Sequence, residues 1–379
     1  MSYDVSVVVP MYNAEKFIQA CVDSALNQTL KNIEVIIVDD RSTDNSLNLC
    51  RELYGNNNRV KIFQQPVNHG PGAARNAGIR EASGEYIAFL DSDDEIMPEH
   101  LQNMFTAAKE HDADVLHNNC LRIMLPLEDG TIPAEMLDYP DNIIITRMDI
   151  GEARTEIQKL SDNLAERFDL WIKGSLHIHV GNKLFRRSFV VDNGLSFPEA
   201  KFPGGTMLSE DEIFCLQCIL SAKNYVLMPG GWYVVRFNDT SATRTAKTVT
   251  RIINAVQSNL EVVKCLRAMG EKIPFIKDEA NFTAAVNAIL QKTENFAVRP
   301  NYQDAGQESL RADERFSALF REEFGDKAPY VEFLFYQLHE TYPELPKLFV
   351  MDHDAMEAVR RAFKEAKAAG KEFILEHKS

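Results

Sequence analysis

The chain has 379 residues, of which 45% are hydrophobic and 26% are charged, and its formal net charge is -15. A chain of this length exceeds the usual length of a domain with a single hydrophobic core, so two or three domains are expected. The negative charge excludes nonspecific nucleic-acid binding, and no apolar run reaches the roughly 20 residues that cross a bilayer. The N-terminus lacks the basic and apolar segments of a signal peptide, which predicts a cytoplasmic protein.

Residues 1–118 alternate apolar strands with amphipathic helices. Strands are expected at 5–9, 33–38, 60–64, 86–90 and 113–117, and helices at 14–26, 44–54, 71–82 and 98–111. Asn13 is expected to cap the first helix. The alternating order and the unbroken apolar strands predict an α/β fold with a mainly parallel sheet between helices.

The pattern weakens beyond residue 118. We expect a polar helix over 151–171, a strand over 177–185, a helix after Glu210 and strands at 225–228 and 232–237. Helices are expected from 241 onward. Their clearest apolar stripe is formed by Ile253, Val256, Leu260, Val263 and Leu266. Cys215 and Cys218 fall in the helical pattern after Glu210, where we expect buried thiols rather than a redox or metal site.

The segment Phe-Leu-Asp-Ser-Asp-Asp-Glu, residues 89–95, is the strongest functional signal. Asp91 and Asp93 follow a predicted buried strand and point to one side of it, at the sheet edge where open α/β folds bind ligands. Two carboxylates aimed at one crevice repel each other unless a cation lies between them. A hard divalent cation that also binds a diphosphate meets this requirement. The alternative is a solvated acidic turn before the next helix.

Polar residues also follow other predicted strands, in segments 9–13, 38–44 and 68–76. Asp39 and Asp40 could accept hydrogen bonds from a base or ribose, although acids are also favourable at a helix start. The small residues before Arg75 allow a close backbone approach to a ligand, and its guanidinium adds a fixed positive charge. Each segment alone is equally typical of an ordinary strand-to-helix turn.

Ser209 and Glu212 have the spacing of a helix capping box, which places Asp211 in the first helical turn. The positive end of the helix dipole is expected to keep Asp211 ionised, as a general base must be. The alternative is an ordinary acidic helix start.

Taken in order, these segments resemble the inverting family 2 glycosyltransferases with a GT-A fold. The resemblance is carried by Val-Ser-Val-Val-Val-Pro-Met-Tyr-Asn, Val-Asp-Asp-Arg-Ser-Thr-Asp-Asn-Ser, Gly-Pro-Gly-Ala-Ala-Arg-Asn-Ala-Gly-Ile and Gly-Glu-Tyr-Ile-Ala-Phe-Leu-Asp-Ser-Asp-Asp. Later, Asn-Lys-Leu-Phe-Arg-Arg-Ser and Glu-Asp-Glu-Ile-Phe look like the family's second-half signatures. The resemblance is close over residues 4–119 and weaker over residues 178–241.

The resemblance implies a role for each matched residue. Asp211 would be the catalytic base, and Asp93, supported by Asp91, would bind Mn²⁺ or Mg²⁺. The nucleotide sugar would be bound by Pro10, Tyr12, Asn13, Asp39, Asp40, Arg75, Asp91 and Ser92. Residues 1–118 would form the nucleotide-sugar-binding half of the GT-A domain, 119–245 the acceptor-binding half with an inserted loop and helix region, and 246–379 a C-terminal helical domain.

The implied activity is transfer of a hexosyl or N-acetylhexosaminyl group from a nucleoside-diphosphate sugar, with a UDP-sugar favoured, to a glycan or lipid-linked acceptor. The family's usual setting is cell-envelope or capsular polysaccharide assembly. No Gln-x-x-Arg-Trp follows Asp211, which argues against a processive synthase. A donor-binding protein without turnover and a sugar nucleotidyltransferase, which would release pyrophosphate, are the alternatives.

Two expectations concern details. Arg41 stands where the family pattern has glycine, so a left-handed backbone is not expected there. Basic residues in 360–371 suggest peripheral contact with the inner face of the membrane, but interspersed glutamates favour a solvated helix face. The C-terminal helices could also form a homodimer.

Overall fold

A computed structural model describes residues 3–118, 122–124, 156–160, 163–173, 176, 178–199, 201–202, 205–207, 209–230, 233–236 and 249–293, with 318 and 321. The chain divides into two compact units, Met1–Ala246 and Lys247–Ser379. The assignment of separate donor and acceptor halves within the first unit remains a prediction.

An eight-stranded sheet organises the first unit, in the order β3-β2-β1-β4-β9-β6-β12-β8. The strands are β1 Val5–Met11, β2 Ile33–Asp39, β3 Val60–Gln64, β4 Tyr86–Phe89, β6 Val115–Asn118, β8 Gln158–Leu160, β9 Lys183–Arg186 and β12 Tyr225–Met228. β9 and β8 run antiparallel to their neighbours, and the other pairs are parallel. This mainly parallel sheet with flanking helices confirms the predicted α/β class and the GT-A fold.

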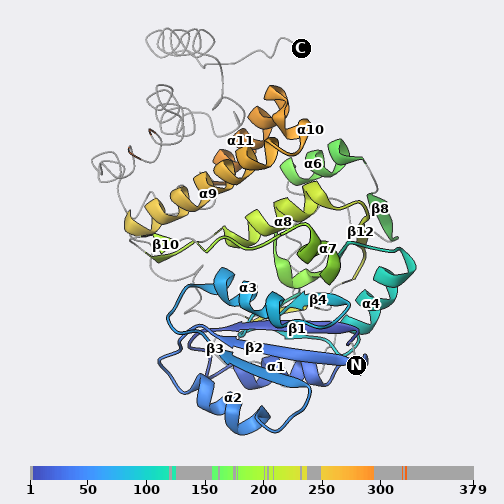
Figure 1. The fold of residues 1–379 in the computed structure, drawn as a ribbon, viewed down its shortest axis with the longest axis vertical. Coiled ribbons are helices and arrows are strands. Elements are labelled where there is room, and N and C mark those ends of the chain that lie inside the picture. The colour runs from blue at the N-terminus through green and yellow to red at the C-terminus, as the bar shows by residue number, and fades with distance from the viewer. Residues whose placement is uncertain are drawn as a thin grey trace. The chain divides into compact units, whose positions relative to one another are not determined.

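Helices cover the sheet on both faces, with α3 above β1 and β2 and with α1 and α2 below them in Figure 1. The helices of the first unit are α1 Ile18–Leu26, α2 Ser46–Tyr54, α3 Pro71–Glu81, α4 His100–Glu110, α6 Leu164–Ile172, α7 Arg187–Asp192 and α8 Glu210–Ser221. Cys215 and Cys218 are buried on α8, as expected.

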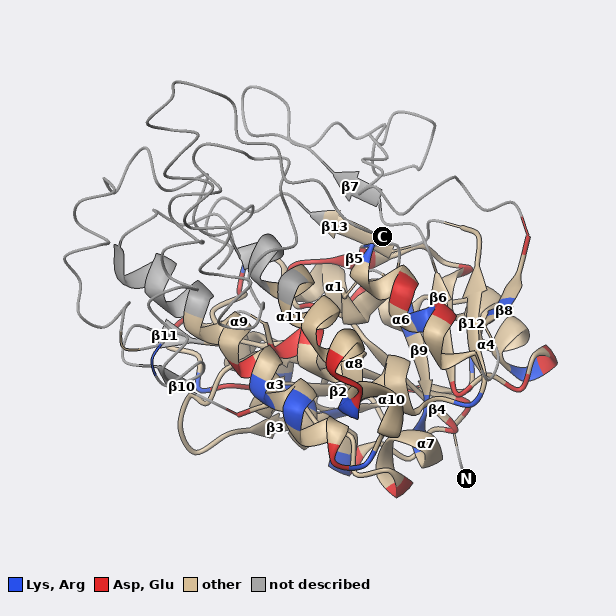
Figure 2. Cartoon of the chain, turned by 90° about the horizontal axis from the view of Figure 1, so that it is seen from above, with Lys and Arg blue, Asp and Glu red and all other residues tan. Residues whose placement is uncertain are grey.

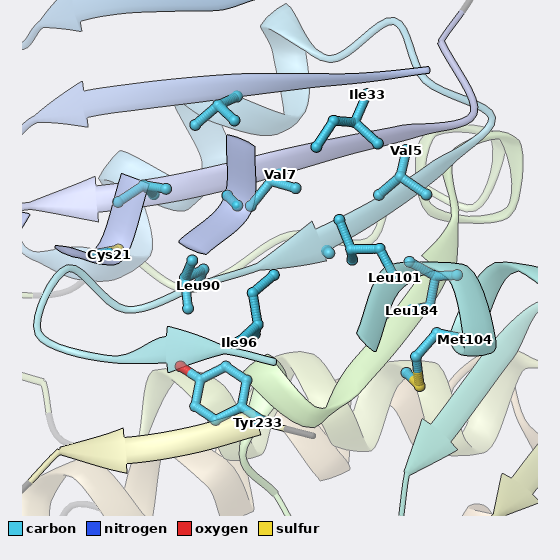
Figure 3. Packing of buried hydrophobic residues seen from close by; sticks show 14 of the residues in the cluster. Val5, Val7, Cys21, Ile33, Leu90, Ile96, Leu101, Met104, Leu184 and Tyr233 are labelled. Atoms are coloured by element: carbon cyan, nitrogen blue, oxygen red, sulfur yellow. The ribbon is translucent and has the colours of Figure 1, made fainter. Parts of the chain in front are cut away.

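The alternation of side chains along β1 explains why it needs helices on both faces. Val5, Val7 and Val9 belong to the same core cluster as Val22 of α1, part of which is seen in Figure 3. Val8 points the other way, toward α3. A Cβ on Gly78 would lie 2.2 Å from the Val8 side chain, so glycine allows α3 to approach the sheet closely.

Two small sheets and a 3₁₀ turn are the other elements among the described residues of the first unit. β5 Glu95–Ile96, β13 Tyr233–Arg236 and β7 Arg122–Met124 form one sheet, in the order β5-β13-β7, and β10 Lys201–Phe202 pairs with β11 Gly205–Thr206. A 3₁₀ turn, η1 Val180–Asn182, leads directly into β9. β5 follows the acidic segment 89–95 directly in the chain, and its pairing with β13 brings the distant residues 233–236 next to it.

The second unit is helical where it is described. α9 Val249–Gly270 packs with α10 Pro274–Lys277 and α11 Glu279–Thr293. Leu260, Val263 and Leu266 of the predicted stripe are buried. No described helix combines the length and the apolar character that a membrane span requires. The basic positions 360–371 lie outside the described residues.

Four local expectations were wrong. The strand expected over 177–185 begins only at Lys183, because residues 180–182 form the 3₁₀ turn η1. The first helix begins at Ile18 rather than after Asn13, whose side chain bonds to a neighbouring loop instead. The predicted helix over 151–171 contains strand β8, which pairs with β12, and a helix that begins only at Leu164. Arg41 has φ +68°, so the left-handed backbone is kept although the family's glycine is absent.

The left-handed conformation of Arg41 leads to a prediction about the stability of the folded protein. A left-handed residue other than glycine costs about 1–2 kcal/mol, which exceeds the entropy that glycine adds to the unfolded chain. Arg41→Gly should therefore raise the free energy of unfolding in urea by up to about 1 kcal/mol. The same change at the exposed helical residue Arg51 should lower it by about 1 kcal/mol. Destabilisation by both substitutions would contradict this explanation.

Candidate functional site

The polar segments predicted from the sequence meet at one edge of the sheet. β1, β2 and β4 are parallel, so the residues that follow them emerge at the same edge. β9 runs the opposite way, so its first residues and the preceding η1 turn reach this edge too. The N-terminus of α8 is held there by ion pairs to α3.

The loops after β1 and β2 are tied to each other. Asn13 has φ +50°, and its Oδ1 accepts a hydrogen bond from the Thr43 backbone N–H at 2.7 Å. Pro10 lies within β1, paired with Val38 of β2. The Tyr12 side chain is half exposed at the end of β1 and is free to contact a ligand.

Asp39 and Asp40 are buried and support the loops around them. Asp39 accepts hydrogen bonds from the Ser42 N–H at 3.1 Å and from the Gln64 side chain at 3.0 Å. Asp40 accepts from two successive backbone N–H groups before α3, those of His69 at 2.8 Å and Gly70 at 2.6 Å. Their predicted contacts with a nucleotide remain predictions.

Arg75 is the electrostatic centre of the site. It projects from α3, is 4% exposed, and lies 2.8 Å from Asp91, 3.0 Å from Glu210 and 2.9 Å from Asp211, measured between nitrogen and oxygen atoms. Figure 2 shows charged segments of α3 and α8 in neighbouring positions. One guanidinium thus joins Asp91, which follows β4, to the start of α8. The three carboxylates remain partly exposed.

The pKa values of these three carboxylates shift in different net directions. Burial raises the pKa of Asp91, but Arg75 and His179 outweigh it and hold the net pKa well below its usual range. Burial, reinforced by the charge of Asp211, raises the pKa of Glu210 to about 7. Burial also raises the pKa of Asp211, with Arg75 opposing this effect and Asp91 adding to it. The net direction for Asp211 is opposite to the one expected from the helix dipole.

The acidic turn, defined as residues Asp91 to Asp94, carries the atoms that could hold a cation. The Asp94 N–H donates to the Asp91 carbonyl at 2.9 Å and closes the turn. Asp91, Asp94 and His179 each offer a ligand atom, all within 4.8 Å of one another. Ser92 and Asp93 lie between Asp91 and Asp94 in the chain and are partly exposed, and the predicted ligand Asp93 is not one of these three clustered donors. This donor set fits a divalent metal ion.

The η1 turn is fixed by a buried lysine. The Lys183 ammonium donates to the His179 carbonyl at 2.7 Å and to the Asn182 side chain at 2.9 Å. Burial lowers the pKa of Lys183. The Val180 N–H of this turn donates a hydrogen bond to Asp211. Lys183 thereby holds the backbone that contacts Asp211.

The structure brings together Arg75, Asp91 and Asp211, which the sequence singled out in separate segments. The predicted capping box does not form, because Ser209 is the N-cap residue but its side chain makes no capping hydrogen bond. Sequence reasoning missed Glu210, Asp94 and Tyr233 as parts of the site. It also assigned no role to His179, which fell in the strand expected over 177–185, whereas His179 precedes η1 and its Nε2 lies 3.6 Å from Asp91.

Residues 6–192 match the sequence profile of glycosyl transferase family 2. This part of the chain belongs to family 2. The chain is 44% identical over 119 residues to the glycosyltransferase GlyG of Streptococcus pneumoniae, covering 31% of this chain and 40% of that protein. It is 31% identical over 222 residues to the poly(ribitol-phosphate) beta-glucosyltransferase of Bacillus spizizenii, covering 58% and 30%. The chain thus spans less than half of the length of these relatives.

Solved structures support the fold. Residues 1–349 of TarS from S. aureus, crystallised with UDP-GlcNAc, align with a TM-score of 0.62 at 20% identity, covering 98% of this chain and 93% of that one. At this level of identity the similarity establishes the GT-A fold alone and does not identify the substrates.

The Arg75 cluster predicts a pH-dependent stability. Removing the guanidinium in Arg75→Met takes the arginine partner away from three partly buried carboxylates, which should cost about 3 kcal/mol near pH 8. The lowered pKa of Asp91 stabilises the folded protein above the unfolded pKa of about 3.9, and this contribution is lost as the pH falls through the folded pKa. In the variant, burial favours the protonated acid instead.

The difference between Arg75→Met and the wild type should therefore be largest near pH 8 and shrink toward pH 4, measured by urea unfolding. Arg80→Met removes an exposed arginine from the same helix and should stay within about 0.5 kcal/mol of the wild type. A loss that is constant across this pH range would contradict the assigned ion pairs.

Proposed function

We propose that this chain is a metal-dependent, inverting glycosyltransferase that moves a sugar from a nucleoside-diphosphate sugar to a hydroxyl of a glycan or lipid-linked acceptor, without processive elongation. The observation that carries this proposal is the shared ion pairing of Asp91 and Asp211 with Arg75. It brings a carboxylate of the candidate metal turn and a candidate base to the same sheet edge.

Asp211 is the proposed general base. Its carboxylate accepts the proton of the acceptor hydroxyl while the hydroxyl oxygen attacks the anomeric carbon. The bond between that carbon and the diphosphate breaks, the nucleoside diphosphate leaves, and the anomeric configuration is inverted. Burial raises the pKa of Asp211, which makes the carboxylate a stronger base than one in water. Arg75 and the Val180 N–H hold its oxygens in place.

The acidic turn is the proposed site for Mn²⁺ or Mg²⁺. Carboxylate oxygens suit both ions, and the neighbouring atoms of Asp91, Asp94 and His179 show that several donors converge there. We assign Asp93 as a ligand, with Asp91 in support. When bound, the ion supplies charge stabilisation for the departing diphosphate.

A UDP-sugar is the proposed donor. The exposed Tyr12 ring, with Asn13 beside it, offers an aromatic surface to a base at the edge that carries the acidic turn. TarS was crystallised with UDP and with UDP-GlcNAc, which supports the choice by similarity of fold. The Bacillus spizizenii relative, named as a glucosyltransferase of a poly(ribitol-phosphate), supports an acceptor from polysaccharide biosynthesis.

Asp211→Asn tests the base. An amide cannot accept the proton, so kcat should fall about 10²–10⁴-fold while the affinity for UDP and Mn²⁺ stays unchanged. Glu210→Gln neutralises the adjacent carboxylate on the same guanidinium and should cause a much smaller loss. Transfer and UDP release are measured together, because release of pyrophosphate would instead indicate a nucleotidyltransferase. Wild-type turnover in Asp211→Asn would rule out the assigned base.

Metal dependence is tested by removing the ion and by changing its proposed ligand. EDTA should abolish transfer, and added Mn²⁺ should restore it. Asp93→Asn should weaken Mn²⁺ binding in the presence of UDP by at least about 10-fold, measured by electron paramagnetic resonance of free Mn²⁺. Glu110→Gln, which neutralises an exposed acid on α4, is the control and should bind Mn²⁺ normally. Full activity in EDTA would refute the metal assignment.

A further inference from the structure

Tyr233 is a buried tyrosine that contacts both ends of the acidic turn. It lies on β13, outside residues 6–192 that match the family profile, and no sequence motif singled it out. We propose that the Tyr233 hydroxyl is a positioning group that sets the geometry of the acidic turn for a divalent cation. The inference rests on the metal site of the proposed function and adds to it a residue from the second half of the domain.

The hydroxyl bridges the first and last residues of the turn. Its O–H donates to Oδ2 of Asp94 at 2.9 Å, and its oxygen accepts the backbone N–H of Asp91 at 3.2 Å. One oxygen atom therefore fixes both the carboxylate of Asp94 and the backbone that carries the Asp91 carboxylate.

Tyr233 is itself held rigidly. It is 0% exposed and pairs across the sheet with Ile96 of β5, the strand that leaves the acidic turn. Figure 3 shows its ring projecting from β13 toward Ile96. On another side, a Cβ on Gly181 would lie 2.4 Å from the ring, so the η1 turn packs directly against it. The His179 ring packs edge-on at 5.0 Å between centroids. A group this constrained can impose its geometry on the turn.

The turn needs such a constraint because it concentrates negative charge. The carboxylates of Asp91, Asp93 and Asp94 are close enough that all three raise the pKa of the neighbouring Cys21 thiol, although burial is the larger cause. The Tyr233 hydroxyl supplies a fixed donor that holds the Asp94 carboxylate in one orientation before a cation arrives. Hydrogen bonds that orient metal ligands typically contribute about 10- to 100-fold to metal affinity.

Tyr233→Phe keeps the ring and removes only the hydroxyl. Mn²⁺ affinity in the presence of UDP, measured by calorimetry on the full chain without acceptor, should fall about 10- to 100-fold. Tyr54→Phe is the matched control, because the Tyr54 hydroxyl also donates to a carboxylate, that of Asp23 at 2.8 Å, outside the acidic turn. The control should bind Mn²⁺ like the wild type, and thermal unfolding confirms that both variants are folded.

Asp94→Ala breaks the same hydrogen bond from the other side, so a double-mutant cycle gives a second test. If the two residues act as a unit, the double variant should lose little more Mn²⁺ affinity than the single variants. Additive losses, or normal Mn²⁺ binding by Tyr233→Phe, would overturn the inference while leaving the proposed metal site intact. A wild-type chain that binds no Mn²⁺ would overturn both proposals.

Discussion

A single buried guanidinium holds this site together. Arg75 joins acids that lie 16 residues along the chain, at Asp91, and 135 residues along, at Glu210. A charge with so little exposure requires partners, and three carboxylates so close to each other require a cation. The ion pairs with Arg75 therefore fix both the start of α8 and the acidic turn at one edge of the sheet. The pKa values of all three acids depend on Arg75.

The sheet topology brings the residues of this ion cluster together. Parallel strands deliver the loops after β1, β2 and β4 to one edge, and the reversed strand β9 starts at that edge after the η1 turn. Lys183, at the start of β9, then fixes the η1 backbone whose Val180 N–H contacts Asp211. The geometry of the proposed base thus also depends on Lys183, a second buried basic residue.

The elements of the first 118 residues were predictable because buried parallel strands are almost wholly apolar. Strand 60–64 was placed with the observed bounds, and α3 differed by one residue. Asp91 and Asp211 were recognised from local motifs. Asn13 was misjudged because its side chain bonds to the loop after β2, a contact that local preferences do not encode. Arg41 was misjudged because residue type alone does not reveal that a residue other than glycine keeps the left-handed backbone. β8 was mistaken for helix because an edge strand is defined by its partner.

His179, Asp94 and Tyr233 were missed for a related reason. Their contacts at the candidate site are long-range: Tyr233 lies 139 residues from Asp94 along the chain. A buried tyrosine in an apolar strand has no local signal that distinguishes a positioning role from ordinary packing. Spatial contact, rather than residue type or spacing, is the information that the sequence lacked.

The most direct test of the account is a crystal structure of the chain with UDP and Mn²⁺. The account predicts Mn²⁺ between the diphosphate and the acidic turn, with Arg75 still paired to Asp91 and Asp211 and with Asp211 facing the space beyond the diphosphate. A metal ion bound away from this turn, or an Asp211 carboxylate directed away from the nucleotide, would contradict it.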